Sequence, residues 1–247
     1  MRYRKGLLLI LLVVIIFAGS LFAERILSPW GVGEKLTFSI RWGMITCGYA
    51  HMEVREKIKL SGRDTYRIVT TARSAQFFDP FYKVRDRVES YIDVENLYTV
   101  RYEQSNREGS YKKDLKIIYD HEHKVAFENN HKFDITEGIQ DVLSALYYLR
   151  TKELEVGKSY EFDVGTGKKT WPLVVDVISR EKVNVPAGEF KTIKVIPRLR
   201  EEGIFKAKGD LEVWLTDDER KYPVQMKSKI EFGTISAVLI KKKLSKK

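Results

Sequence analysis

The chain has 247 residues, of which 43% are hydrophobic and 32% charged, and its formal net charge is +10 at pH 7. This hydrophobic content predicts a folded body and excludes a disordered chain. Most of the positive excess lies at the two ends, within residues 2–5 and 241–247, so the body lacks the basic patch typical of nucleic-acid-binding proteins and we expect no such partner.

The first 23 residues have the layout of a secretory signal peptide. Three basic residues within positions 2–5 precede an apolar run over 7–17, and small residues follow. We expect cleavage after Ser20 or after Ala23, and export of the mature chain to a bacterial periplasm. The alternative is an uncleaved membrane anchor, because a spanning helix needs about 20 apolar residues and positions 6–23 nearly reach that length.

Nearly all of the mature chain alternates apolar and polar residues. Leu36, Phe38, Ile40 and Trp42 form one such apolar row, and a period of two is typical of strands that bury one face. Turn signals separate successive runs. The predicted strands are 34–44, 47–60, 63–74, 82–94, 97–108, 110–119, 123–128, 158–166, 170–183, 189–199, 203–216, 221–232 and 234–242. Long consecutive strands pair by default as antiparallel neighbours, which predicts one β-rich domain over 24–240 and a basic tail over 241–247.

The residues that usually bind metals are few and scattered. Cys47 is the only cysteine, so neither an internal disulfide nor a cysteine zinc site can form, and we expect a small buried hydrophobe. His121 and His123 would face the same side of a strand, but they lie where a hairpin turn is expected. No metal, cofactor or catalytic residue is predicted.

Two neighbouring features are candidates for ligand contact. Phe77, Phe78, Phe81 and Tyr82 surround a proline turn, and exposed loop aromatics often mark a binding surface or a lid. A plug folded over a barrel mouth is the alternative. Asp86 lies in an otherwise apolar strand row, where an inward carboxylate needs a partner. We expect either an ion pair with Arg or Lys on a neighbouring strand, or a polar anchor within a ligand cavity.

One helix is predicted, over 142–150. Asp141 is a good N-cap, and Leu143, Leu146 and Tyr147 share one face of the helix. A short, mostly apolar helix must pack against another element. The predicted fold is therefore mainly β, with a single long, curved antiparallel sheet or open barrel wrapped around one central α-helix.

Several segments together carry a family resemblance. They are residues 33–38, 82–87, 89–93, 141–150, 185–190, 214–218 and 222–224. This combination resembles the exported bacterial proteins grouped as domain of unknown function 3108, over about residues 33–240. The resemblance implies a periplasmic β-rich domain without an established activity, so it assigns no catalytic residue. A looser analogy, of fold alone, links a curved sheet over a helix to the periplasmic lipoprotein carriers.

The functional prediction is a non-enzymatic periplasmic protein that binds an apolar or amphipathic envelope ligand, such as a lipid or a lipoprotein acyl chain. Trp42 and Leu146 would line its cavity, and the loop from Phe77 to Tyr82 would gate it. Two alternatives are a glycan-acting enzyme that uses Asp86 with a second carboxylate, and a scaffold without a small ligand. At the C-terminus, a solvated tail is the simplest interpretation, and contact with anionic lipid headgroups is the alternative for Lys241, Lys242 and Lys243.

Overall fold

The computed structural model describes residues 28–166, 168–199, 211–230 and 233–245. The predicted signal peptide lies outside these residues. Within the described ranges, no helix has the length and apolar character needed to cross a membrane.

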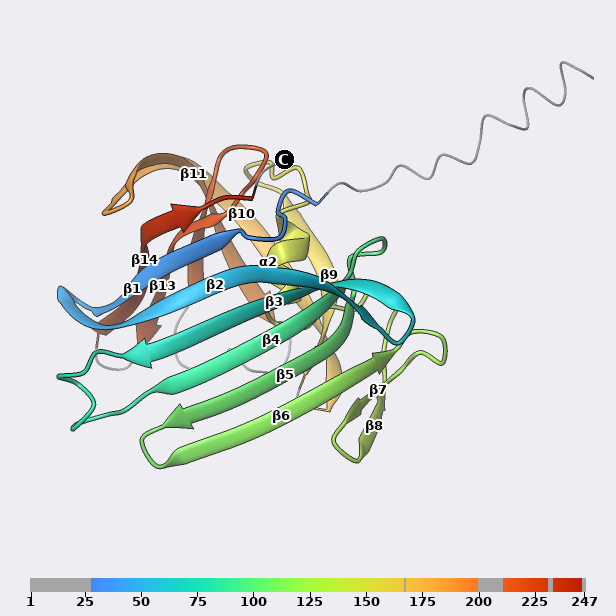
Figure 1. The fold of residues 1–247 in the computed structure, drawn as a ribbon. Helices are drawn as coiled ribbons and strands as arrows, with labels where there is room; N and C mark the ends of the chain where they lie inside the picture. Colours follow the sequence, from blue (N-terminus) through green and yellow to red (C-terminus); the bar gives the residue numbers. More distant parts are fainter. Residues whose placement is uncertain (1–27, 167, 200–210, 231–232, 246–247) are drawn as a thin grey trace, which may run out of the picture.

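The described chain forms one 14-stranded antiparallel sheet (Figure 1). Its spatial order is β8-β7-β6-β5-β4-β3-β2-β1-β14-β13-β12-β11-β10-β9, so β14 pairs with β1 and joins two meanders in the middle of the sheet. The first eight strands are β1 (Lys35–Trp42), β2 (Ile45–Leu60), β3 (Arg63–Ser74), β4 (Arg85–Asp93), β5 (Thr99–Glu108), β6 (Tyr111–Asp120), β7 (Val125–Glu128) and β8 (His131–Asp134). The other six are β9 (Ser159–Thr166), β10 (Lys169–Val185), β11 (Gly188–Leu199), β12 (Leu211–Thr216), β13 (Pro223–Ile230) and β14 (Gly233–Lys243). The mainly β, antiparallel prediction is confirmed.

The sheet curves strongly but is not closed into a barrel by a strand ladder. Its two edge strands, β8 and β9, do not pair with each other. Isolated contacts link the two edge regions instead: a single parallel bridge joins Gln140 to Val164, and the Tyr119 hydroxyl donates to the Gly165 carbonyl at 2.7 Å. Of the two predicted forms, the open sheet is therefore the correct one.

The helix is shorter than expected. α2 (Ser144–Leu149) has six residues, and residues 142–143 form a turn instead. The Asp141 carboxylate does accept the N–H groups of Leu143 and Ser144, at 2.7 and 2.8 Å. Burial raises the pKa of Asp141, although hydrogen bonds from Ser90 and from these N–H groups oppose the rise. With so little helix, the prediction of a sheet organised around a central helix is not supported.

The core lies on the inner, concave face of the sheet. One cluster gathers around Phe38, Ile68 and Trp214, and a second around Val175 and Val213. A third lies under β5 to β8. α2 contributes buried side chains to the first two clusters, so it ties the two halves of the sheet together at one end.

The sheet has two distinct ends. α2 and the C-terminus lie toward one end, whereas the β1–β2 turn, the loop between β3 and β4, and the β5–β6 turn lie together at the other (Figure 1). We call this second end the rim. β14 runs through Lys243, so Lys241, Lys242 and Lys243 belong to the sheet rather than to a solvated tail. They lie at the end opposite the rim, where the Lys242 ammonium donates to the Tyr222 hydroxyl at 2.8 Å.

Candidate ligand-binding site

An apolar cavity of about 360 Å³ opens at the rim. Strands β1, β2, β3 and β14 and the loop between β3 and β4 surround it. Its lining residues are Ile40, Trp42, Cys47, Gly48, Ala72, Arg73, Ser74, Phe78, Tyr82, Val84 and Ile235. We call this space the rim cavity. Its volume is in the range of small-molecule sites, which are typically about 300–1,000 Å³.

Small residues on adjacent strands leave this space open. Gly48 pairs with Ser74, and Ala50 pairs with Ala72, so the β2–β3 ladder carries little side-chain volume where it meets the rim. Gly48 is also required for close backbone packing, because a Cβ at this position would lie 2.2 Å from the Arg73 carbonyl oxygen. In the sequence these residues continue the alternation typical of strands. Their small size was therefore the only sequence feature that could have indicated a cavity here.

The loop between β3 and β4 carries four aromatic residues over positions 77–82, and we call it the aromatic loop. A polar cluster fixes its base. The Arg85 guanidinium donates to both Asp79 carboxylate oxygens, at 2.5 and 3.1 Å, and the Ser74 hydroxyl donates to Asp79 at 2.5 Å. Hydrogen bonds from Arg85 and Ser74 lower the pKa of Asp79. The Ala75 N–H donates to the Cys47 carbonyl at 2.7 Å, which joins the start of the loop to β2.

The loop turns only some of its aromatic side chains toward the cavity. Phe78 and Tyr82 line it, whereas Phe77 and Phe81 point to solvent and are 61% and 84% exposed. The Tyr82 ring also packs against Gly109: a Cβ added to Gly109 would lie 3.1 Å from Cε2 of Tyr82. Trp42 reaches the same cavity from the end of β1. The structure thus brings together three of the predicted site residues, Trp42, Phe78 and Tyr82.

Leu146 lines a second apolar cavity, of about 170 Å³, which lies beside α2. This cavity lies between α2 and the inner face of β9 to β13. It is lined by Val142, Ala145, Leu146, Leu149, Phe162, Val164, Leu173, Val175, Val195, Pro197, Leu211, Val213 and Met226. Leu146 therefore does not join the other predicted site residues.

Asp86 has a different partner from the one expected. Its carboxylate accepts the backbone N–H of Arg107 at 2.9 Å, instead of pairing with the side chain of an Arg or Lys. Burial raises the pKa of Asp86; the Arg107 N–H opposes this rise and the nearby Glu108 carboxylate adds to it. The regular β4–β5 register ends at Arg87 and Ser105, so the Asp86 carboxylate continues the connection between these strands. Asp86 does not line the rim cavity.

Cys47 and the histidines also differ in detail from expectation. Cys47 is only half-buried, and its thiol donates to the Ile45 carbonyl at 3.4 Å while its side chain lines the rim cavity. His121 and His123 do lie in a turn, where the His121 ring stacks on Tyr98 with centroids 3.6 Å apart. In the described part of the chain, no group of three or more His, Cys, Asp or Glu side chains is placed to hold a metal ion.

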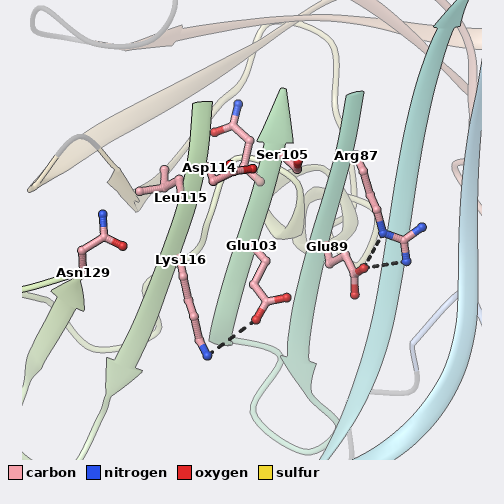
Figure 2. Close-up of a pocket in the computed structure, with 9 residues that line it drawn as sticks. Arg87, Glu89, Glu103, Ser105, Asp114, Leu115, Lys116 and Asn129 are labelled. Atoms are coloured by element: carbon pink, nitrogen blue, oxygen red, sulfur yellow. Dashed lines mark hydrogen bonds and ion pairs between the residues drawn. The ribbon is translucent and has the colours of Figure 1, made fainter. Parts of the chain in front are cut away.

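A third, polar pocket of about 280 Å³ involves β4, β5 and β6 (Figure 2). Glu89 and Glu103 are directly opposite each other on neighbouring strands, which is the arrangement that a pair of catalytic carboxylates would need. Both are already ion-paired, Glu89 with Arg67 and Arg87 and Glu103 with Lys116. Burial alone would raise the pKa of Glu89, but hydrogen bonds from the two arginines and Tyr91 outweigh it and hold the value at about 2. A carboxyl group with this pKa is ionised at neutral pH and cannot serve as a general acid.

Solved structures align with most of this chain at low sequence identity. A β-barrel-like protein of domain of unknown function DUF1849 from Brucella abortus aligns with a TM-score of 0.62 and 12% identity, covering 88% of this chain and 99% of that one. A protein from Bacteroides fragilis described as exported, with a YmcC-like fold, aligns with a TM-score of 0.42 and 13% identity, over 87% and 97% of the two chains. The first likeness supports the fold alone.

Sequence comparison gives the family. No curated protein matches the chain significantly in sequence. A family model does match, over residues 37–240, which include every strand from β2 to β13 and most of β1 and β14. The chain therefore belongs to the family described as protein of unknown function DUF3108.

Proposed function

We propose that this protein is a non-enzymatic periplasmic protein that binds an apolar or amphipathic molecule of the cell envelope, such as a lipid or an acyl chain, in the rim cavity. The observation that carries the proposal is the cavity itself. It is apolar, it has the volume of a small-molecule site, and Trp42, Phe78 and Tyr82 converge on it from a strand end and a loop.

The chemistry of the lining favours a hydrocarbon over a polar ligand. Most lining side chains are aliphatic or aromatic, and each methylene group removed from water contributes about 0.8 kcal/mol. Ser74 and Arg73 are the polar members of the lining, and the Ser74 hydroxyl already binds Asp79. An amphipathic molecule would therefore place its chain in the cavity and its headgroup at the rim.

The carboxylates of the polar pocket give no support to the enzyme alternative. A glycan hydrolase needs one protonated carboxyl group beside a second, ionised one. Glu89 is held ionised by its arginines, with a pKa of about 2, and Asp86 binds a backbone amide away from this pocket. Glu89 therefore lacks the environment of a general acid, and Asp86, whose pKa is raised by burial and by Glu108, is not among the residues that line this pocket.

Displacement of a fluorescent fatty acid from the mature protein tests the proposal. Ala72→Phe places a ring in the cavity and should weaken binding at least tenfold, about 1.4 kcal/mol or more. Phe78→Ala removes a lining ring and should weaken binding by about 1–2 kcal/mol. Phe127→Ala is the matched control, because Phe127 is exposed on β7, away from the cavity.

Two results would contradict the proposal. One is a parent protein that does not bind the probe and that carries no lipid when examined by native mass spectrometry. The other is a parent that binds with the same affinity as Ala72→Phe. The first result would favour a scaffold without a small ligand.

The periplasmic part of the proposal depends on the basic and apolar N-terminal segment. Intact-mass measurement of the protein from a periplasmic extract should give a chain that begins after Ser20 or after Ala23. A full-length mass found only in membranes would support the uncleaved anchor instead.

A further inference from the structure

Large apolar side chains are exposed in unusual number at the rim. Met44 at the tip of the β1–β2 turn is 97% exposed and Phe81 is 84% exposed. Ile45, Phe77, Tyr111 and Ile230 are exposed at the same end. Isolated exposed apolar residues are normal, but a concentration of them marks a contact surface.

The segments that carry these residues form one continuous edge. The Gly43 N–H donates to the Thr234 carbonyl at 3.1 Å and joins the β1–β2 turn to β14. The loop between β3 and β4 is joined to β2 by the bond from Ala75 to Cys47, and to the β5–β6 turn by the Gly109 N–H, which donates to the Lys83 carbonyl at 2.8 Å. The apolar tips therefore project together from a connected base.

Positive charge surrounds this apolar edge. Lys112 and Lys113 are the second and third residues of β6, and Lys229 lies near the end of β13; all three side chains are exposed. Within the described residues, none of the three forms an ion pair. Two acidic groups of the rim are ion-paired, Asp79 with Arg85 and Asp114 with Arg107. A third, Glu108, accepts hydrogen bonds from Tyr82 and Asn106. The rim thus combines apolar tips with unpaired cations.

We propose that the rim is a docking surface for an anionic phospholipid bilayer. The apolar tips would enter the boundary between headgroups and acyl chains, while the lysines would contact the lipid phosphates. The rim cavity opens at this same surface, so a docked protein would face the bilayer with the mouth of its cavity. This last point depends on the proposed function; the docking itself does not.

Under this proposal, the lysines at the C-terminal end of β14 do not contact the membrane. Lys241 and Lys243 are exposed at the opposite end of the sheet. They would point away from a membrane that the rim contacts. They therefore provide a control for charge alone.

Co-sedimentation of the mature protein with phospholipid vesicles tests the docking. The protein should bind vesicles of phosphatidylcholine mixed with phosphatidylglycerol, and bind pure phosphatidylcholine more weakly. The double variant Met44→Asp/Phe81→Asp should lose binding to both, with an unchanged melting temperature because both side chains are exposed. Lys112→Gln/Lys113→Gln should weaken binding to the anionic vesicles roughly tenfold or more.

Two control variants separate the rim from general effects. Val32→Asp/Val156→Asp introduces the same charges at exposed apolar positions outside the rim, and Lys241→Gln/Lys243→Gln removes the same charge at the opposite end. Both should bind vesicles like the parent. The proposal is overturned if the parent binds neither vesicle, if Met44→Asp/Phe81→Asp binds like the parent, or if the controls lose as much binding.

Fatty-acid displacement without vesicles keeps this proposal distinct from the proposed function. Met44 and Phe81 do not line the rim cavity, so their double variant should displace the probe like the parent. Vesicle binding without fatty-acid binding would support docking and contradict the ligand proposal. Fatty-acid binding without vesicle binding would support the ligand proposal and contradict docking.

Discussion

Removing the charge of Glu34 is expected to destabilise this fold more than removing one member of an exposed ion pair. Glu34 and Arg150 form a bidentate pair, with Nη1–Oε1 and Nη2–Oε2 distances of 2.7 and 2.9 Å. Both side chains are at most 1% exposed. The Arg150 Nε also donates to the Arg220 carbonyl at 2.9 Å, and its guanidinium lies 5.4 Å from the centroid of the Trp30 ring. The pair thus joins the residue before β1 to the C-cap residue of α2.

The magnitude follows from burial. Breaking a buried ion pair on one side costs about 3–5 kcal/mol, because the remaining charge stays away from water. Glu34→Gln keeps one acceptor oxygen, which places the expected loss near 3 kcal/mol. For a domain of this size, each kcal/mol lowers the melting temperature by about 2–4 °C, so we expect a decrease of about 6–12 °C.

Urea unfolding followed by circular dichroism measures this loss. Glu155→Gln is the matched control, because Glu155 pairs with Lys158 at 2.8 Å in an exposed position, where such pairs contribute about 0–1 kcal/mol. The double change Glu34→Leu/Arg150→Met removes both charges and should cost less than Arg150→Met alone. If Glu34→Gln costs no more than Glu155→Gln, the reasoning from burial is refuted.

Three further predictions follow from single sites. The depressed pKa of Glu89 means that its contribution to stability is complete above the ordinary value of 4.5 and is lost as the pH falls through about 2; pH-dependent melting should show a loss of about 3 kcal/mol that Glu89→Gln lacks. Leu146→Asp places a charge in the apolar cavity beside α2 and should lower the free energy of unfolding in urea by several kcal/mol. An unchanged urea midpoint would show that this face of α2 does not contribute to stability. Gly48→Ala should lower the melting temperature by several degrees, because its Cβ would collide with the Arg73 carbonyl; equal melting curves would show that the β2–β3 backbone can relax.

The sheet was predictable because alternation reports burial directly. The row Leu36, Phe38 and Ile40 faces inward as its period of two predicts, apart from a bulge after Ile40. β8 was missed because its four residues, His131–Asp134, contain only one apolar side chain and so show no alternation. The helix was predicted too long because residues 142 and 143 form a turn before α2. The Asp141 carboxylate accepts the N–H groups of residues 143 and 144 in this turn.

The site was only partly predictable because it depends on strand register. Phe78 and Tyr82 were identifiable as loop aromatics, but nothing local places Trp42, more than 30 residues earlier, beside them. That proximity arises because β1 pairs with β2 and β2 with β3. The buried pair of Glu34 and Arg150 was missed for the same reason. Its members lie 116 residues apart, and each stands next to other polar residues in the sequence.

The aromatic loop can be divided into two functions by the direction of its side chains. Phe78 and Tyr82 are four residues apart and line the cavity, while Phe77 and Phe81, also four apart, face solvent. The Tyr82 N–H donates to the Phe78 carbonyl at 2.9 Å, and a helical turn of this kind places residues i and i+4 on one face.

Replacing all the phenylalanines together would therefore mix two effects that single changes keep apart. Phe78→Ala should weaken fatty-acid binding without reducing vesicle binding. Phe81→Ala should weaken vesicle binding without changing fatty-acid affinity, because its ring does not touch the cavity. If each single change impaired both assays equally, the loop would act as one rigid plug over the cavity mouth, and the separation of ligand and membrane contacts would be wrong.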